Sequence, residues 1–321
     1  MDTSLAKTRC DLLQAINCEI QVLEDSIRES KCRRNALVPI SRLPPEVLSL
    51  IFSLLSFSAA HNKSDRHVSS LLRVTHVCRL WRDTALNCPH PWSHINFTKL
   101  SRVVITEMLS RAKMAPLHLE AKIDYKNKTQ LAFFKQQLKA HISHTRQLSL
   151  SEQFQTVLER FISSAPALEF LSLADLSSHP DRPMDVPAAL FNNTGPKLAG
   201  LELYRCDISW KSPLLRGLRS LRIWGPVRQA RPPLKDWLDA LDEMSQLETL
   251  ILHNASPICC TAIISEPQRT ITLPFLTQFE ITACVLDCVL ALAHLVLPAL
   301  TLLSVDIPRI DRRGNGIGLL I

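Results

Sequence analysis

Glycine is scarce in this chain, with 7 residues among 321, although soluble proteins ordinarily contain about 7% glycine. This shortage argues against the glycine-rich loops that hold nucleotides and phosphates. The stretch "GNGIG" at 314–318 has neither a lysine nor a helix after it, so we interpret it as a flexible tail. No G-x-S-x-G motif is present. We therefore expect a protein that is not an enzyme and takes no cofactor.

The ten cysteines form no C-x-x-C pair. The first residues, "MDTSLAKTRC", lack the apolar run of a signal peptide. Reduced thiols and a cytoplasmic or nuclear location are therefore expected. Cys78, Cys88, His90 and His94 lie close in sequence but match no standard zinc spacing, so no metal site is predicted.

Strong clusters of positive charge are also missing. The formal charge is +7, but the basic residues are scattered apart from "KCRR" at 31–34 and "DRRG" at 311–314. This distribution indicates a solvated surface rather than a nucleic-acid partner. The long apolar run at 285–305 contains Asp287, His294 and Pro298. Because a charge is costly inside a bilayer, we predict a helix, a turn and a strand there, and no membrane partner.

Residues 1–37 are predicted to form an N-terminal helix. Apolar residues recur at alternating spacings of three and four, which places them on one stripe: Leu13, Ile16, Ile20, Leu23 and Ile27. The stripe lasts only two heptads, shorter than a convincing coiled coil. It is equally consistent with a helix that packs on its own chain and with self-association.

Residues 38–97 are predicted to form a small all-helical module. Pro44 and Pro45 suit the first turn of a helix, where a missing N–H group costs nothing. In that helix Glu46, Ser49, Ser53 and Ser56 form a narrow polar strip, and the other side chains are apolar. A helix with so narrow a polar strip must be covered from more than one direction. We expect the strip to be the part left to water and the excess apolar surface to meet a partner.

A second helix of this module is predicted over 69–86. It would place on one face the side chains of Leu71, Val74, Cys78, Trp81 and Ala85. Pro89 and Pro91 end it. The polar stretch 58–70 between the two helices is predicted to be a surface loop.

Residues 98–321 contain an internal repeat. Four segments, starting at Pro166, Pro196, Pro274 and Pro298, fit the pattern P-x-L-x-x-[LF]-x-[LIV], and three weaker copies fit without the proline. The sixth position of the pattern is occupied by Leu148, Leu171, Leu201, Leu221, Leu250, Phe279 and Leu303. Successive sixth positions are separated by 23, 30, 20, 29, 29 and 24 residues. These intervals span the repeat length of leucine-rich repeats.

Each repeat is predicted to be a short strand with buried alternate leucines, followed by a connection along the outer face. Helical connections are expected at 154–162 and 234–244. The residues between the buried leucines would point to the inner, concave face. Tyr204, Trp224 and His253 hold one register position in successive repeats, so an aromatic row is expected there as a binding site. The proposed substrate-binding residues on this face are Glu202, Tyr204, Arg222, Trp224, His253 and Glu280.

The motifs of the helical module resemble a known family. "LPPEVLSLIF", "LLRVTHVCRLWRDTAL" and "PHPWSHINF" resemble the F-box, in the form common in large fungal families. The matching positions are Leu43, Pro44, Pro45, Glu46, Val77, Cys78, Trp81, Arg82 and Trp92. The stretch 58–70 is longer than in compact F-boxes, which leaves the pairing of the two helices open.

The resemblance implies an α+β chain with a small F-box-like helical module at 38–97. An α/β repeat at 98–321 would follow it, as an irregular leucine-rich-repeat solenoid with a curved parallel sheet and outer helices. The ending "DRRGNGIGLLI" lacks an obvious capping repeat, which leaves open whether this solenoid is complete.

The family's function would make the chain a substrate-recognition subunit of an SCF-type cullin-RING ubiquitin ligase. The module would bind the Skp-type adaptor, and through it the cullin, while the repeats would bind an unknown protein substrate. The implied adaptor-binding residues are Leu43, Pro44, Pro45, Glu46, Leu48, Ile51, Phe52, Leu55, Val77, Cys78 and Trp81. The alternative is a non-catalytic repeat scaffold whose helices merely cap the solenoid and bind no adaptor.

Overall fold

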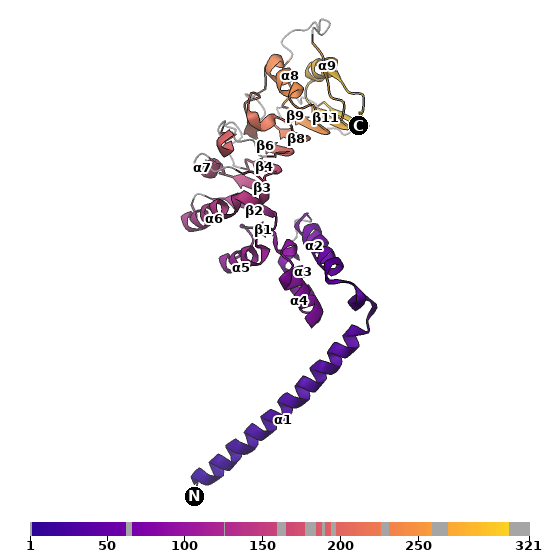
Figure 1. Cartoon of the computed structure of the whole chain (residues 1–321). Coiled ribbons are helices and arrows are strands. Elements are labelled where there is room, and N and C mark those ends of the chain that lie inside the picture. Colours follow the sequence, from indigo (N-terminus) through magenta and orange to yellow (C-terminus); the bar gives the residue numbers. More distant parts are fainter. Residues whose placement is uncertain are drawn as a thin grey trace. The chain divides into compact units, whose positions relative to one another are not determined.

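The structure, a computed structural model, describes residues 2–61, 66–124, 126–158, 165–176, 184–187, 190–193, 197–225, 231–258 and 269–307. The chain divides into two compact units (Figure 1). The first comprises Met1–His94 and Glu107–Lys113, and the second comprises Ile95–Thr106 and Met114–Ile321. The domain boundary expected after residue 97 therefore lies within Ile95–Thr106, which belongs to the second unit.

The first unit begins with helix α1 (Asp2–Ala36). All five side chains of its predicted apolar stripe are exposed: Leu13, Ile16, Ile20, Leu23 and Ile27. Packing of this stripe against the same chain is thus not found among the residues that the structure describes. Self-association through the stripe stays a prediction.

Three further helices of this unit form a bundle. They are α2 (Pro45–His61), α3 (Arg66–Thr75) and α4 (Arg79–Asn87), flanked by the 3-10 turns η1 (Pro39–Arg42) and η2 (His90–Trp92). The Pro44 carbonyl accepts hydrogen bonds from the amides of Val47 and Leu48, at 3.0 and 3.1 Å. Helix α2 therefore starts at the two prolines, as the sequence predicts.

The predicted single helix over 69–86 is wrong, because α3 and α4 are separate. Cys78 is extended, with φ −157° and ψ 174°, and it caps the amino end of α4. Ahead of it the Thr75 hydroxyl donates to the Leu72 carbonyl at 2.7 Å. β-Branched Val74, Thr75 and Val77 lose rotamer freedom in a helix, and the threonine bond offers the backbone a competing partner. Together these features favour a break at this point.

The predicted loop over 58–70 is also too long. Helix α2 continues to His61 and helix α3 already begins at Arg66. Residues 62–65 lie outside the described part of the chain.

The second unit is built on a nine-stranded sheet with the order β1-β2-β3-β4-β6-β8-β9-β11-β13. Every adjacent pair from β2 to β13 is parallel. The strands are β1 (His94–Asn96), β2 (Leu117–Ile123), β3 (Thr145–Glu152), β4 (Phe170–Ala174), β6 (Gly200–Tyr204), β8 (Ser220–Trp224), β9 (Thr249–His253), β11 (Gln278–Thr282) and β13 (Leu302–Asp306).

The connections contain helices and two minor sheets. The helices are α5 (Arg102–Ala112), α6 (Lys128–His141), α7 (Gln155–Leu158), α8 (Leu234–Asp242) and α9 (Val285–Ala293), with 3-10 turns η3 (Ile142–His144), η4 (Leu190–Asn193) and η5 (Pro213–Leu215). The minor sheets pair β5 (Met184–Asp185) with β7 (Cys206–Asp207) and β10 (Ile271–Thr272) with β12 (Leu295–Val296). Figure 1 shows α6 and α7 on one side of β2, β3 and β4.

The strand register follows the repeat predicted from sequence. The seven residues at the sixth repeat position are direct cross-strand partners from β3 to β13: Leu148, Leu171, Leu201, Leu221, Leu250, Phe279 and Leu303. An eighth partner, Leu119 on β2, precedes them. The pattern misses this strand because Met114, Pro116 and Ala121 occupy the positions that the pattern reserves for Pro, for Leu and for Leu, Ile or Val.

In the described part of the chain, the two faces of this sheet differ in burial. On β6, for example, Leu201 and Leu203 are fully buried while Glu202 and Tyr204 are not, and β4 and β8 alternate in the same way. Parallel sheets are ordinarily covered on both faces. One face of this one is therefore open among the described residues.

Other predicted connections can be compared directly with the structure. Helix α8 confirms the helix expected over 234–244, and α9, β12 and β13 confirm a helix, turn and strand over 285–305. Helix α7 covers only 155–158 of the helix expected over 154–162, and 159–162 lie outside the described residues. In the described ranges, no helix has both the length and the apolar character to cross a membrane.

Candidate functional site

The bundle of the first unit is held together by residues that had been expected on its surface. Leu48 and Phe52 are 0% exposed and form its core with Val74 and Ala85. The Phe52 ring lies 5.3 Å from the Trp81 ring. Leu48 and Phe52 therefore pack inside the module rather than on its exposed surface. This differs from the assignment made from sequence.

The exposed surface of α2 is nevertheless apolar. Leu50 is 64% exposed and Leu54 is 67% exposed, and Val47 and Leu55 are exposed as well. Val47, Leu50 and Leu54 follow one another at spacings of three and four, which places them on one stripe of the helix. We call these four residues the α2 face.

The polar strip of α2 is only partly exposed to water. Glu46 is exposed as expected, Ser49 and Ser53 are half-buried, and the side chain of Ser56 lies outside the described residues. The Ser53 hydroxyl donates to the Ser49 carbonyl at 2.9 Å, so it is satisfied within the helix. The expectation that this strip alone would remain in water is wrong, because Leu50 and Leu54 are more exposed than Ser49 and Ser53.

The other adaptor-binding residues predicted from sequence fall into two groups. Pro44, Pro45, Glu46, Leu55 and Val77 are exposed, whereas Leu43, Ile51, Cys78 and Trp81 are half-buried. The break between α3 and α4 exposes Val77 and, one turn later, Leu80. Sequence reasoning missed Val47, Leu50, Leu54 and Leu80 as exposed apolar residues. The spacing of these residues places Val47, Leu50 and Leu54 on one stripe of α2, but an apolar pattern on most sides of the helix does not tell which stripe is exposed.

Trp92 closes the bundle at its carboxyl end. Its indole N–H donates to the Ala85 carbonyl at 2.8 Å, and the ring is buried. The Arg111 guanidinium lies 4.5 Å from the ring centre, and it also donates to Glu107 at 2.8 Å. A cation over an indole is attracted to its face. Trp92 is thus a structural anchor of the module.

The second candidate surface is the open face of the sheet. Its predicted residues occupy two adjacent register rows from β6 to β11, as the sequence indicates. One row is Glu202, Arg222, Ile251 and Glu280, and the other is Tyr204, Trp224, His253 and Thr282. We call the six residues proposed from sequence, together with Asp306 on β13, the sheet face. Ile251 and Thr282 are buried within it.

The side chains of the sheet face are connected to one another. Trp224 and His253 stack, with ring centres 5.8 Å apart and planes 11° apart. The His253 Nδ1 and the Thr282 hydroxyl are hydrogen-bonded at 2.8 Å. Arg222 pairs with Glu202 at 3.2 Å. Tyr204 is 42% exposed, and the other five proposed residues are half-buried.

The imidazole of His253 is neutral near pH 7. Burial lowers the pKa of His253, and the carboxylates of Glu280 and Asp306 oppose this effect without overcoming it. The strand register places both carboxylates near this ring, since Glu280 aligns with Ile251 on the strand of His253 and Asp306 aligns with Thr282, the hydrogen-bond partner of His253.

The size and charge of the side chains on this face of the sheet change between β4 and β6. At the same register rows, β3 and β4 present Ser149, Ser151, Ser172 and Ala174. The Phe170 ring packs closely against the backbone of β6 at Gly200. A Cβ atom at this glycine would lie 2.6 Å from the ring. The small side chains of β3 and β4 in these rows therefore separate Glu120 and Lys122 on β2 from the bulky and charged side chains that follow from β6 onward.

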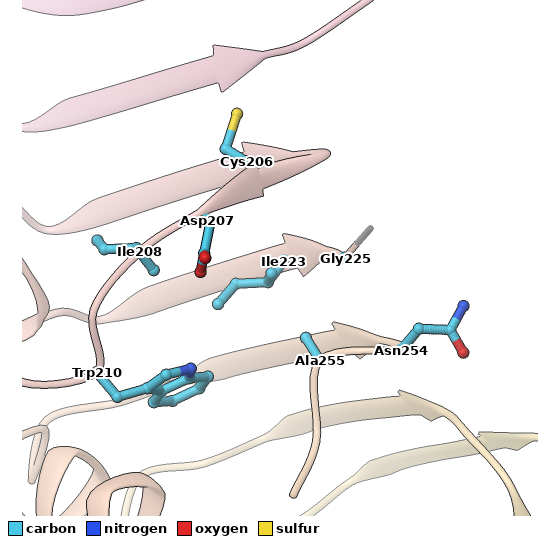
Figure 2. A pocket seen from close by; sticks show the side chains of 8 residues that line it. All are labelled: Cys206, Asp207, Ile208, Trp210, Ile223, Gly225, Asn254 and Ala255. Carbon is cyan, nitrogen blue, oxygen red and sulfur yellow. The ribbon is translucent and has the colours of Figure 1, made fainter. Parts of the chain in front are cut away.

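A small pocket lies at the carboxyl ends of β6, β8 and β9 (Figure 2). It is lined by Cys206, Asp207, Ile208, Trp210, Ile223, Gly225, Asn254 and Ala255. Its volume of about 20 Å³ is enough for one water molecule. Burial raises the pKa of the Cys206 thiol to about 12, and its Sγ faces the carbonyls of Leu173 and Tyr204 at 3.4 and 3.2 Å. The thiol is therefore unreactive, and the pocket is too small for an organic substrate.

Metal-binding side chains do not gather in the described parts of the chain, where no group of three or more His, Cys, Asp or Glu residues could hold an ion. His141 and His144 are neighbours, with ring centres 5.3 Å apart. Burial lowers both pKa values, and the neighbouring His144 lowers that of His141 further.

Comparison with protein families supports the module in the first unit. The F-box-like family model matches residues 40–98. No curated protein matches the chain. The chain thus carries an F-box-like domain that spans η1, the three-helix bundle, η2 and β1, and domains of this class generally bind Skp-type adaptors.

Proposed function

We propose that this chain is a substrate-recognition subunit of an SCF-type cullin-RING ubiquitin ligase, found in the cytoplasm or nucleus. The F-box-like domain would bind a Skp-type adaptor through the α2 face, and the sheet face would bind a protein substrate. The chain itself would perform no chemistry. The observation that carries the proposal is an exposed leucine stripe inside the region that matches the F-box-like family.

The adaptor part of the proposal rests on the cost of leaving the α2 face in water. Its four residues are contiguous and carry no charge. Exposed apolar patches of this kind mark interaction sites more often than scattered single residues do. Each leucine that a partner fully covers contributes about 1.5–3 kcal/mol.

The substrate part rests on the open face and on the regular strand register. We propose that the second unit is an irregular leucine-rich-repeat solenoid, because seven repeat positions align across consecutive parallel strands. In such arrays the face opposite the connecting helices is used for binding. Aromatic residues and arginine, which are enriched at protein interfaces, are found here as Tyr204, Trp224 and Arg222.

The test is co-purification of the full chain with a recombinant Skp-type adaptor. Leu50→Asp with Leu54→Asp introduces two charges on the exposed side of α2 and leaves the core residues untouched. We expect adaptor affinity to fall by more than about 100-fold, since two lost leucine contacts amount to about 3–6 kcal/mol.

The matched control is Val285→Asp with Val289→Asp, which changes two exposed valines at the same spacing on α9. It should leave adaptor binding unchanged. Wild-type binding by the α2 variant would show that the α2 face is the wrong site. No adaptor binding by the wild-type chain would favour the repeat-scaffold alternative.

A further inference from the structure

The sheet face carries a local charge opposite to that of the whole chain. The chain has a formal charge of +7. In the two register rows from β6 to β13, however, the charged residues are the carboxylates Glu202, Glu280 and Asp306 and one guanidinium, Arg222. His253 adds no charge near pH 7 because burial lowers its pKa.

Two of these carboxylates have no cationic partner within the described part of the chain. Glu202 is paired with Arg222. Glu280 accepts a hydrogen bond from the Gln278 amide at 2.7 Å, but among the described residues neither Glu280 nor Asp306 forms a salt bridge. The Asp306 Oδ1 is buried and has no hydrogen-bond partner in the same part of the chain. A half-buried carboxylate without a partner is costly, and a cation supplied by another molecule removes that cost.

The aromatic pair lies beside these carboxylates. Trp224 and His253 stack, and the pKa of His253 responds to Glu280 and Asp306. A basic segment that crosses from β8 to β13 meets the aromatic pair first and the two carboxylates further along the same face. Arginine suits the sheet face better than lysine, since the guanidinium is planar, stacks on aromatic rings, is weakly hydrated and forms forked bonds to carboxylates.

The same charges disfavour nucleic acid. Binding to DNA or RNA is driven by Lys and Arg that neutralise phosphates. Here the cation Arg222 is already paired, and the remaining carboxylates repel phosphate. The observations therefore favour a protein partner with positive charge.

We propose that the sheet face from β6 to β13 binds an arginine-bearing, net basic segment of a partner protein, with a guanidinium next to Trp224 and His253 and paired to Glu280 or Asp306. The claim that this segment belongs to a ubiquitylation substrate rests on the proposed function. The binding itself does not.

The test uses the full chain and fluorescein-labelled peptides in which arginine alternates with Gly-Ser spacers. Matched peptides carry lysine, citrulline or glutamate in place of arginine. Fluorescence anisotropy should give the order arginine, lysine, citrulline, glutamate from tightest to weakest. Glu280→Gln with Asp306→Asn should weaken arginine-peptide binding at least tenfold, and so should Trp224→Ala.

The control is Glu243→Gln with Glu248→Gln, which removes the same charge from two exposed residues paired to Arg216 and Arg219. It should leave binding within twofold of wild type, and thermal melts check that every variant is folded. Equal binding of the arginine and citrulline peptides, or unchanged binding by both sheet-face variants, would overturn the proposal. Tighter binding of a labelled single-stranded oligonucleotide that Trp224→Ala abolishes would overturn it as well.

The variant Leu50→Asp with Leu54→Asp separates the two proposals. If it loses the adaptor and keeps the arginine peptide, both stand. If the wild-type chain binds the peptide but no adaptor, only the ligase function fails. If it binds the adaptor but shows no preference for arginine, only the basic-segment proposal fails.

Discussion

The α2 face and the sheet face are both exposed, yet they differ in chemistry. The α2 face consists of leucine and valine without a charge, whereas the sheet face mixes aromatic rings with carboxylates and a guanidinium. Apolar interface cores are typical of lasting assemblies. Complementary charges give selectivity and a rapid encounter. The difference suggests one surface for a constant partner and one that selects among partners.

The two surfaces also differ in the packing of the residues beneath them. The α2 face belongs to the same helix as the core of a small bundle. Leu50 is exposed, whereas Leu48 and Phe52, two positions before and after it, are fully buried. From β6 to β11 the sheet face lies on strands whose opposite sides are buried, whereas Leu303 and Val305 on the opposite side of β13 are exposed. A change in the bundle therefore affects a large share of its small core, while a change in the repeats is spread over neighbours.

The largest expected effect contrasts two residues of α2. Phe52→Ala removes a fully buried ring from the core and should destabilise the bundle by about 3–5 kcal/mol. Leu54→Ala, on the α2 face, should change its stability by less than about 0.5 kcal/mol. Hydrogen exchange of the α2, α3 and α4 amides measures the loss separately from the sheet.

Exchange in β8 and β9 serves as the internal control for this comparison and should stay slow in both variants. Equal losses for Phe52→Ala and Leu54→Ala would mean that α2 is rotated about its axis relative to the structure. The assignment of the α2 face would then be wrong.

The next effect concerns a buried ion pair of the second unit. Asp287 on α9 pairs with Arg231 at 2.7 Å, and both are buried or nearly so. Arg231 also donates to the carbonyl and hydroxyl of Ser256, at 2.8 and 2.9 Å. Asp287→Ala leaves the guanidinium uncompensated and should lower the free energy of unfolding by about 3 kcal/mol. Urea denaturation of the second unit measures this loss.

A surface pair provides the matched comparison. Arg219 and Glu248 are both more than half exposed, so Glu248→Ala should have an effect of about 0–1 kcal/mol. If the two substitutions had equal effects, Arg231 and Asp287 would not act as a buried link between segments of the repeat region.

The register of the sheet could be predicted from the sequence because a strand has a period of two. A slip by one residue would move every leucine of a repeat to the open face, so the leucine pattern determines which residues face each other. Tyr204, Trp224 and His253 are neighbours for this reason. The exception, β2, keeps Leu119 at the sixth position but departs from the pattern at Met114, Pro116 and Ala121.

The orientation of α2 could not be predicted in the same way. A helix that is apolar on most sides shows that several sides are covered, but the sequence does not say which side faces its own bundle. The break at Cys78 depends on the balance between local β-branched residues and bundle packing. The link between Arg231 and Asp287 joins distant segments, and no local pattern marks it.

The smallest expected effect is a pH dependence of the sheet face alone. Burial lowers the pKa of His253 from its usual 6.5, so the ring is neutral at pH 7.5 and becomes protonated only as the pH falls below that usual value. Protonation would add a cation beside Trp224, near Arg222, while Glu280 and Asp306 lie close to the ring. Carboxylates are generally ionised above about pH 5 and arginine stays charged throughout. Affinity for the arginine peptide should therefore fall severalfold between pH 7.5 and 5.5, and His253→Gln should remove that fall.

Adaptor binding by the uncharged α2 face should not follow the same titration. Identical pH profiles for the wild type and His253→Gln would show that His253 does not contact the bound segment, which would remove the imidazole from the proposed peptide site.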